Sequence, residues 1–135
     1  MKYLYVLMIF LLASACNTKP EPIRYGLDSC DECRMTILDK HFGGEIITKK
    51  GKVYKFDAAE CLDAFYHHTS EPVARVYFVD FNQPGQLIPA KDAFLLQDAK
   101  LHSPMGKGIA AFSTKAAAEN AWREFGGKIV RCPLP

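Results

Sequence analysis

Residues 51–62, GKVYKFDAAECL, decide how this chain folds, because a strand pattern ends and a helix pattern begins within them. Val53–Phe56 is predicted to be a β-strand, which a Lys-Gly-Lys turn joins as a hairpin to the strand candidate Glu45–Thr48. Asp57 is predicted to be the N-cap of the next helix, with Glu60 three residues later completing a capping box. Together these signals predict a strand–strand–helix unit.

The helix after this cap is predicted to run from Ala58 to about His68. Its apolar residues share one helical face, which consists of Ala58, Cys61, Leu62, Phe65 and Tyr66. Because Cys61 belongs to this face, burial in the core is favoured over metal ligation for its thiol.

The second half of the chain repeats this order of elements. Extended segments are expected at Ala74–Val79, Ile88–Leu96, Gly108–Phe112 and Lys128–Arg131, and a helix capped by Ser113 or Thr114 is expected over Lys115–Phe125. The two helix entries, FDAAE at 56–60 and FSTKA at 112–116, look alike, and a loop with a methionine precedes each. The sequence therefore predicts an α+β fold, a small domain of two similar strand–strand–helix halves. Two unrelated capped helices are the alternative.

The composition places the chain among globular proteins and argues against a nucleic-acid partner. Of its 135 residues, 49% are hydrophobic and 24% are charged, which is too apolar for a disordered chain. The formal net charge is only +2 and no basic run is present, whereas nucleic-acid-binding proteins carry a basic patch. The sequence has no P-loop, dinucleotide fingerprint or nucleophile–base motif, so it offers no positive case for an enzyme.

The first 15 residues have the pattern of an export signal. A lysine, a short apolar run and small residues precede Cys16, and the run is too short to span a bilayer, which takes about 20 apolar residues. The segment resembles a bacterial lipoprotein signal, in which the cysteine is acylated; an ordinary secretory leader is the alternative. Residues 1–15 are thus predicted to be a signal peptide, 16–26 a lipidated flexible tether, and 27–135 the folded domain.

Soft sulfur donors mark two loops of the predicted domain. Cys33 and Met35 lie in the first loop and Met105 lies in the second, although methionine normally fills gaps in a core. Thiolate and thioether sulfurs suit Cu(I), and Met105 would complete a site between the two halves. A tight turn at Arg34 is required, because residues two positions apart point to opposite sides of an extended chain. Local gap filling by each methionine is the alternative.

The pair Cys30 and Cys33 permits other chemistry. A Cys-x-x-Cys sequence can be a redox pair or half of a zinc site, but Cys61 and Cys132 stand alone in the sequence and supply no second pair. A redox pair favours a helix N-terminus, and no long helix is predicted after Cys33. In an exported protein, a plain disulfide that joins Cys30 or Cys61 to Cys132 is a further alternative.

These motifs, taken in order, resemble those of the NosL family. The resemblance rests on the leader, on Cys33-Arg34-Met35, on FGGEI at 42–46, on GKVYKFD at 51–57, and on PMG at 104–106 followed by AFS at 111–113. It covers about residues 28–131. It implies two similar strand–strand–helix halves in a lipoprotein of the cell envelope, anchored to a membrane and facing the periplasm.

Matched position by position, the resemblance also implies a set of metal ligands. The cysteine and methionine of the family's Cys-Gly-Met motif fall on Cys33 and Met35, and the methionine of its later Met-Gly loop falls on Met105. Arg34 replaces the usual glycine. Cys30 is an additional thiol that either joins the site or protects it as a disulfide.

Two functions follow as expectations. The resemblance implies a Cu(I) carrier rather than an enzyme. This carrier would deliver copper to nitrous oxide reductase and its copper-loading machinery during assembly of the copper centre. His102, three residues before Met105, is a less certain nitrogen donor to this copper. The alternative function is an exported thiol–disulfide oxidoreductase that uses Cys30 and Cys33.

Overall fold

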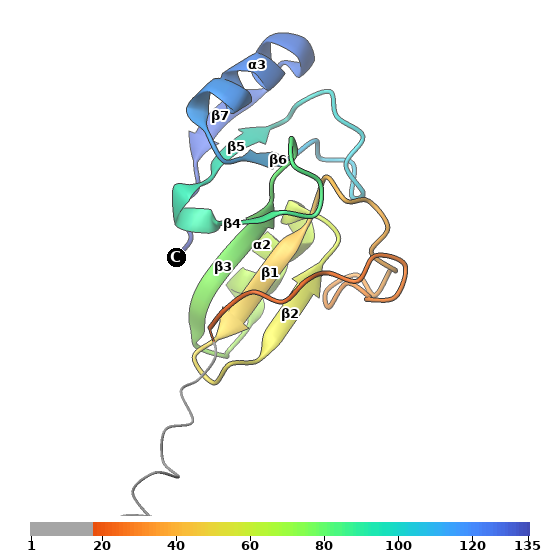
Figure 1. Ribbon diagram of the computed structural model, residues 1–135, viewed down its shortest axis with the longest axis vertical. Helices are drawn as coiled ribbons and strands as arrows, with labels where there is room; N and C mark the ends of the chain where they lie inside the picture. The colour runs from red at the N-terminus through yellow and green to blue at the C-terminus, as the bar shows by residue number, and fades with distance from the viewer. Residues whose placement is uncertain (1–17) are drawn as a thin grey trace, which may run out of the picture.

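The computed structural model describes residues 18–135 (Figure 1). The predicted signal peptide and the predicted lipidation site at Cys16 lie outside these residues. No helix within 18–135 has the length and apolar character needed to cross a membrane.

The first half of the fold is a four-stranded antiparallel sheet with one helix. Its elements are β1 (Gly44–Thr48), β2 (Val53–Phe56), α2 (Ala59–His68), β3 (Val73–Val79) and β4 (Leu87–Pro89). The strand order is β2-β1-β3-β4, so β1 is central and pairs with both the hairpin strand β2 and the returning strand β3. The predicted hairpin is confirmed, and α2 packs against β1 and β2.

The second half is a three-stranded antiparallel sheet with its own helix, drawn at the top of Figure 1. Its elements are β5 (Phe94–Gln97), β6 (Ala110–Phe112), α3 (Lys115–Phe125) and β7 (Lys128–Arg131), in the strand order β6-β5-β7. A 3-10 turn, η1 (Ala90–Asp92), connects the two sheets. The expectation of one extended segment over Ile88–Leu96 is therefore wrong, because η1 divides that segment into β4 and β5.

Apart from the additional strand β4 in the first half, the two halves have the same topology, which confirms the predicted α+β duplication. In each half the first strand is central, the second and third strands flank it, and the helix connects the second to the third. The comparison of the two methionine loops is wrong, however. Met105 lies between the first and second strands of its half, whereas Met35 precedes the first strand of its own. The duplication therefore does not account for the placement of the two methionines.

The two helices begin differently. Thr114 caps α3 as predicted, since its Oγ1 accepts a hydrogen bond from the Ala117 N–H at 3.2 Å. The predicted capping box of Asp57 and Glu60 is wrong, because the N-cap of α2 is Ala58 and no side chain caps it. Both carboxylates are buried and are used elsewhere.

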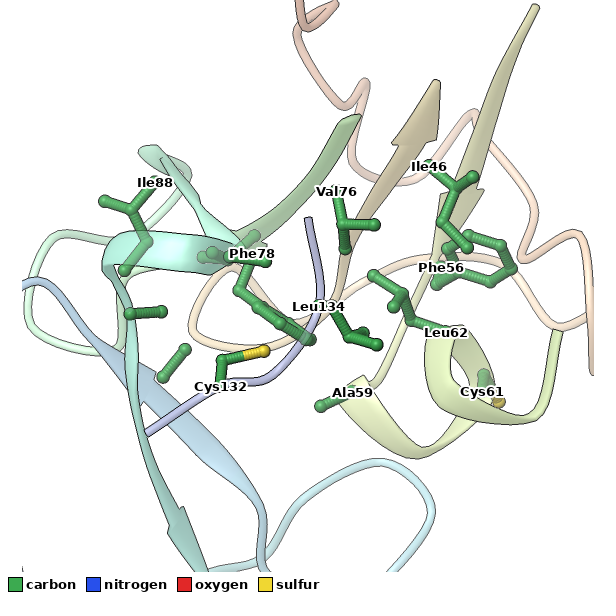
Figure 2. Close-up of a cluster of buried hydrophobic side chains, with 14 of the residues drawn as sticks. Ile46, Phe56, Ala59, Cys61, Leu62, Val76, Phe78, Ile88, Cys132 and Leu134 are labelled. Atoms are coloured by element: carbon green, nitrogen blue, oxygen red, sulfur yellow. The ribbon is translucent and has the colours of Figure 1, made fainter. Parts of the chain in front are cut away.

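The core consists of two hydrophobic clusters, and the larger one contains residues of both halves. The main hydrophobic cluster combines first-half side chains such as Phe56, Leu62 and Phe78 with Cys132 and Leu134 from the C-terminal segment. Figure 2 shows Cys132 beside Phe78, with Cys61 on the α2 helix in a different part of the cluster.

The segment before the predicted domain boundary is part of the fold. Ile23 is buried in the main cluster, and the Glu21 N–H donates a hydrogen bond to Glu45 Oε2 at 3.0 Å. The flexible tether predicted to extend to residue 26 is therefore too long, because packing begins by Glu21. The sequence signal for this packing was Ile23, an apolar residue near the end of a polar, proline-rich stretch.

Candidate metal site

A tight turn presents the first group of cysteines. The Cys30 N–H donates to the Met35 carbonyl at 2.8 Å and the Arg34 N–H donates to the Cys30 carbonyl at 3.0 Å, which closes the loop at its base. Arg34 has a φ of +67°, the left-handed conformation that favours glycine. The turn that the sequence required between Cys33 and Met35 is thus present, with an arginine where the NosL motif has glycine.

Charged contacts fix this loop to the exposed edge of the first sheet. The Asp31 N–H donates to the Lys55 carbonyl at 2.8 Å, and the Lys55 N–H donates to Asp31 Oδ2 at 2.7 Å. The Lys55 ammonium also lies 2.8 Å from the buried carboxylate of Asp28. Burial alone would raise the pKa of Asp28, but its hydrogen bonds to Lys55 and Arg24 hold that pKa well below the usual range. The loop is therefore held in place whatever it binds.

Four potential ligands meet beneath this turn. One ligand atom from each of Cys30, Cys33, Asp57 and Cys61 lies within 4.8 Å of all the others. We call these residues the Cys3Asp cluster. They come from three places, namely the turn, the end of β2 and the first turn of α2. A metal–sulfur bond of about 2.3 Å places the sulfurs around one ion about 4 Å apart, so the cluster fits an ion without rearrangement of the backbone.

Two thiols of the cluster, those of Cys30 and Cys61, have raised pKa values. Burial raises the pKa of Cys30 to about 11, although the backbone N–H groups of Glu32, Cys33 and Asp57 hydrogen-bond to its sulfur and oppose the shift. Burial raises the pKa of Cys61 as well, and the adjacent Cys30 and Asp57 add to the effect. A metal ion that binds here must therefore displace protons.

Asp57 is the acceptor within the cluster. The Cys33 thiol donates to Asp57 Oδ2, with the sulfur 3.5 Å from the oxygen. Oδ1 of the same carboxylate is buried and has no hydrogen-bond partner among the described residues. A buried carboxylate oxygen without a partner is costly, and a cation at the cluster would satisfy it.

The two methionines lie outside the cluster and near the surface. Met35 is 47% exposed and Met105 is 42% exposed. Met35, Asp57, His102 and Pro104 line a surface hollow of about 390 Å³. The structure therefore brings the second loop beside Met35, as the sequence predicted. His102 and Pro104 are the residues of that loop that line the hollow, and Met105 itself does not line it.

Glu60 holds the second loop against the first half. Its Oε1 accepts hydrogen bonds from Ser103 Oγ at 3.0 Å and from the Lys107 N–H at 3.1 Å. Ser103 Oγ in turn accepts the Gly108 N–H at 2.9 Å. The sequence assigned this carboxylate to a capping box, but in the structure it anchors the loop of Met105 to the start of α2. Glu60 directly precedes Cys61 in the chain.

Sequence reasoning missed two members of the cluster. Asp57 was assigned to a helix cap, and Cys61 was assigned to core burial. Cys61 is buried, but its thiol also belongs to the cluster. The available signal was that Asp57 and Cys61 both lie within a few residues of the predicted helix start.

The alternatives for the cysteines are also resolved in part. Cys30, Cys33, Cys61 and Cys132 are free thiols, so the disulfide considered between Cys132 and either Cys30 or Cys61 does not form in this structure. Cys132 is buried away from the cluster. A zinc site of four thiolates is likewise not what these residues build, because the fourth donor is a carboxylate.

The fold and the cluster define a small α+β domain with a candidate metal site of three thiols and one carboxylate. Comparisons with known proteins agree with this class. A sequence model of the NosL family matches residues 25–133, and the chain therefore belongs to the NosL family. Among solved structures, the crystal structure of the copper chaperone NosL from Shewanella denitrificans is similar, with a TM-score of 0.75 and 27% identity. The match covers 85% of this chain and 93% of that one. No curated protein sequence matches this chain.

Proposed function

We propose that this protein is a membrane-tethered metallochaperone that binds Cu(I) and delivers it to nitrous oxide reductase during assembly of the copper centre. Family membership and the similarity to a solved copper chaperone support a copper-handling role. The observation that carries the proposal is the position of Cys33. Its thiol is half-buried and belongs to the Cys3Asp cluster, and the exposed Met35 follows it two residues later in the same tight turn.

The proposed ligands are Cys33, Met35 and Met105. All three are polarisable sulfur donors, which suit Cu(I) better than Mg²⁺ or Ca²⁺. Cys30 and His102 are additional candidate donors, because Cys30 lies in the Cys3Asp cluster and His102 faces the hollow beside Met35. The exposure of both methionines leaves one side of the site open, so a partner's ligand can approach and copper can transfer by stepwise exchange of ligands.

The proposal also places the protein at a membrane. Acylation of Cys16 would anchor the mature chain to the cell envelope, facing the periplasm, because two acyl chains suffice for stable attachment. The net charge of +2 is too small for strong electrostatic steering toward a partner. Tethering near the copper-loading machinery would therefore supply much of the encounter probability.

The geometry disfavours the alternative, a thiol–disulfide oxidoreductase. An attacking thiol works as a thiolate and usually has a lowered pKa, whereas burial raises the pKa of Cys30 to about 11. The turn that carries Cys30 and Cys33 leads to an isolated bridge between Ser29 and Thr36, and not to the N-terminus of a helix. The proposed carrier needs no catalytic residue.

The test is an anaerobic titration of the purified protein with Cu(I), followed by competition with a Cu(I) chelator. Cys33→Ser should abolish chelator-resistant binding. Met105→Leu should keep the fold, because swaps of similar volume cost less than about 1.5 kcal/mol, and should weaken binding about tenfold. An unchanged affinity for Met105→Leu would remove the second loop from the site.

Delivery is tested in cells that need nitrous oxide reductase. Deletion of this protein at limiting copper should leave the reductase copper-deficient, and a strain with Cys33→Ser should have the same defect. A fully loaded reductase in the deletion strain would contradict the proposed delivery.

A further inference from the structure

We infer that the protein has a second, inner position for the same Cu(I) ion, formed by Cys30, Cys33 and Cys61 with Asp57 at its edge. This inference rests on the proposed function and extends it. The exposed position at Cys33, Met35 and Met105 exchanges copper, and the inner position retains it. The two positions share Cys33.

The inner position is shielded from solvent, unlike the outer one. Cys30 is 0% exposed, Cys61 is 3% exposed and Asp57 is 4% exposed, whereas both methionines are more than 40% exposed. The mutual separation of the four ligand atoms, within 4.8 Å, is close to the spacing of sulfurs around one bound ion. An ion seated there would be out of reach of small competing ligands.

Backbone hydrogen bonds hold two of the thiols in place before an ion arrives. The Cys30 N–H donates to the Met35 carbonyl and the Arg34 N–H donates to the Cys30 carbonyl. The turn that carries Cys30 and Cys33 is therefore closed at its base, and both thiols belong to the Cys3Asp cluster.

Asp57 supplies an independent indication that a cation binds at the cluster. Its Oδ1 is buried and has no partner among residues 18–135, while Oδ2 accepts the Cys33 thiol. Asp57 also lines the surface hollow beside Met35, so the residue lies between the inner position and the surface. It is therefore placed to attract an incoming ion and to stay beside it in the inner position.

The movement between positions is an exchange of ligands at a constant oxidation state. Copper stays bound to Cys33, loses its thioether donors, and gains the sulfurs of Cys30 and Cys61. Each thiol that binds releases its proton to solvent, and no electron is transferred. The copper can therefore move inward or outward without leaving the protein.

The structure offers a matched pair of variants for the test. Cys61 and Cys132 are both buried free cysteines in the main hydrophobic cluster, but only Cys61 belongs to the Cys3Asp cluster. Cys61→Ala and Cys132→Ala therefore remove similar groups from the same core. Cys61→Ser, which keeps the volume and replaces sulfur by a harder oxygen donor, serves as a second variant if Cys61→Ala does not fold.

The experiment compares the rate at which a chelator removes Cu(I) from the full mature protein under anaerobic conditions. Cys61→Ala and Cys61→Ser should lose copper at least about tenfold faster than the unchanged protein, a modest change for the loss of a metal ligand. The ultraviolet Cu(I)–thiolate absorption should fall in both. Cys132→Ala should match the unchanged protein in both measurements.

The outcomes separate the two claims. If the unchanged protein binds no Cu(I), the proposed function fails. If it binds Cu(I) and the Cys61 variants retain copper as well as it does, the inner position is wrong and the proposed function stands. If the Cys61 variants lose affinity for Zn(II) alone, the inner position is a zinc site and the inference is overturned.

Discussion

The two halves of the molecule share a topology but differ where their helices begin. In the second half, Thr114 caps α3 and stabilises its first turn. In the first half, Ala58 provides no cap to α2, and Asp57 takes part in the Cys3Asp cluster instead. The third helical residue is Cys61 in α2 and Ala117 in α3. One half uses the helix start for stability, and the other uses it to assemble ligands.

The same contrast extends to the buried polar groups. The second residue of the central strand is Glu45 in the first half and Leu95 in the second, and both are buried. The buried side-chain atoms without a partner in residues 18–135 belong to Tyr25, Glu45, Asp57 and Glu60, and none is in the second half. Each such atom costs about 1–3 kcal/mol. The duplicated unit therefore carries its chemistry in one copy, at the expense of that copy's stability.

Replacement of Glu45 should give the largest effect on stability. Burial raises the pKa of Glu45 to about 7 from the usual 4.5. The folded state therefore binds more protons than the unfolded state between these values, so stability falls as the pH rises from about 4.5 to about 7. Glu45→Gln, which cannot ionise, should gain about 2–3 kcal/mol relative to the unchanged protein between pH 4.5 and pH 8.

Urea unfolding at several pH values measures this gain. Leu95→Met, at the corresponding position of the second half, is the control, and its stability should show the same dependence on pH as the unchanged protein. If the difference in free energy of unfolding between Glu45→Gln and the unchanged protein does not vary with pH, the buried-carboxylate explanation is contradicted.

Single substitutions at the two helix starts should separate stability from copper binding. Thr114→Ala should cost about 1 kcal/mol of stability and leave Cu(I) affinity unchanged, because it removes only a cap. Asp57→Asn should stay within about 1 kcal/mol of the unchanged stability, because the side chain that it replaces is buried and has an unpartnered oxygen. It should, however, weaken Cu(I) binding severalfold. Thermal melts and chelator competition measure both variants, and equal effects on copper would contradict the division of roles.

The smallest predicted effect concerns Arg34. A non-glycine residue in the left-handed conformation is strained by about 1–2 kcal/mol, and glycine relieves the strain but gains entropy in the unfolded state. Arg34→Gly should therefore raise stability by about 0.5–1 kcal/mol. Arg34→Ala retains the strained conformation and should not be stabilised. A loss of stability in Arg34→Gly would show that the Arg34–Asp31 ion pair outweighs the strain.

The sequence predicted elements whose signals are local. The hairpin of β1 and β2, the cap at Thr114 and the span of α3 were all predicted, because periodicity and turn residues determine them. The capping box at Asp57 was not correct, because a carboxylate before a helix can serve either the helix or a more distant partner. Only the fold determines which of these it serves.

The candidate site was also predicted only where its residues lie close together in the chain. Cys33 and Met35 share one turn, so their chemistry was visible in the sequence. Cys61 lies far from them in the chain, and its apolar neighbours on α2 are typical of core residues. Its approach to Cys30 depends on the packing of α2 against the first sheet, which no spacing in the sequence encodes.

Copper K-edge X-ray absorption of the anaerobically loaded protein tests the central claim most directly, because it reports the oxidation state and the donor atoms together. The account predicts copper that is reduced and coordinated mainly by sulfur, in a spectrum that Cys33→Ser abolishes and Cys132→Ala leaves unchanged. Copper that is oxidised, or bound by nitrogen and oxygen alone, or unaffected by Cys33→Ser, would contradict it.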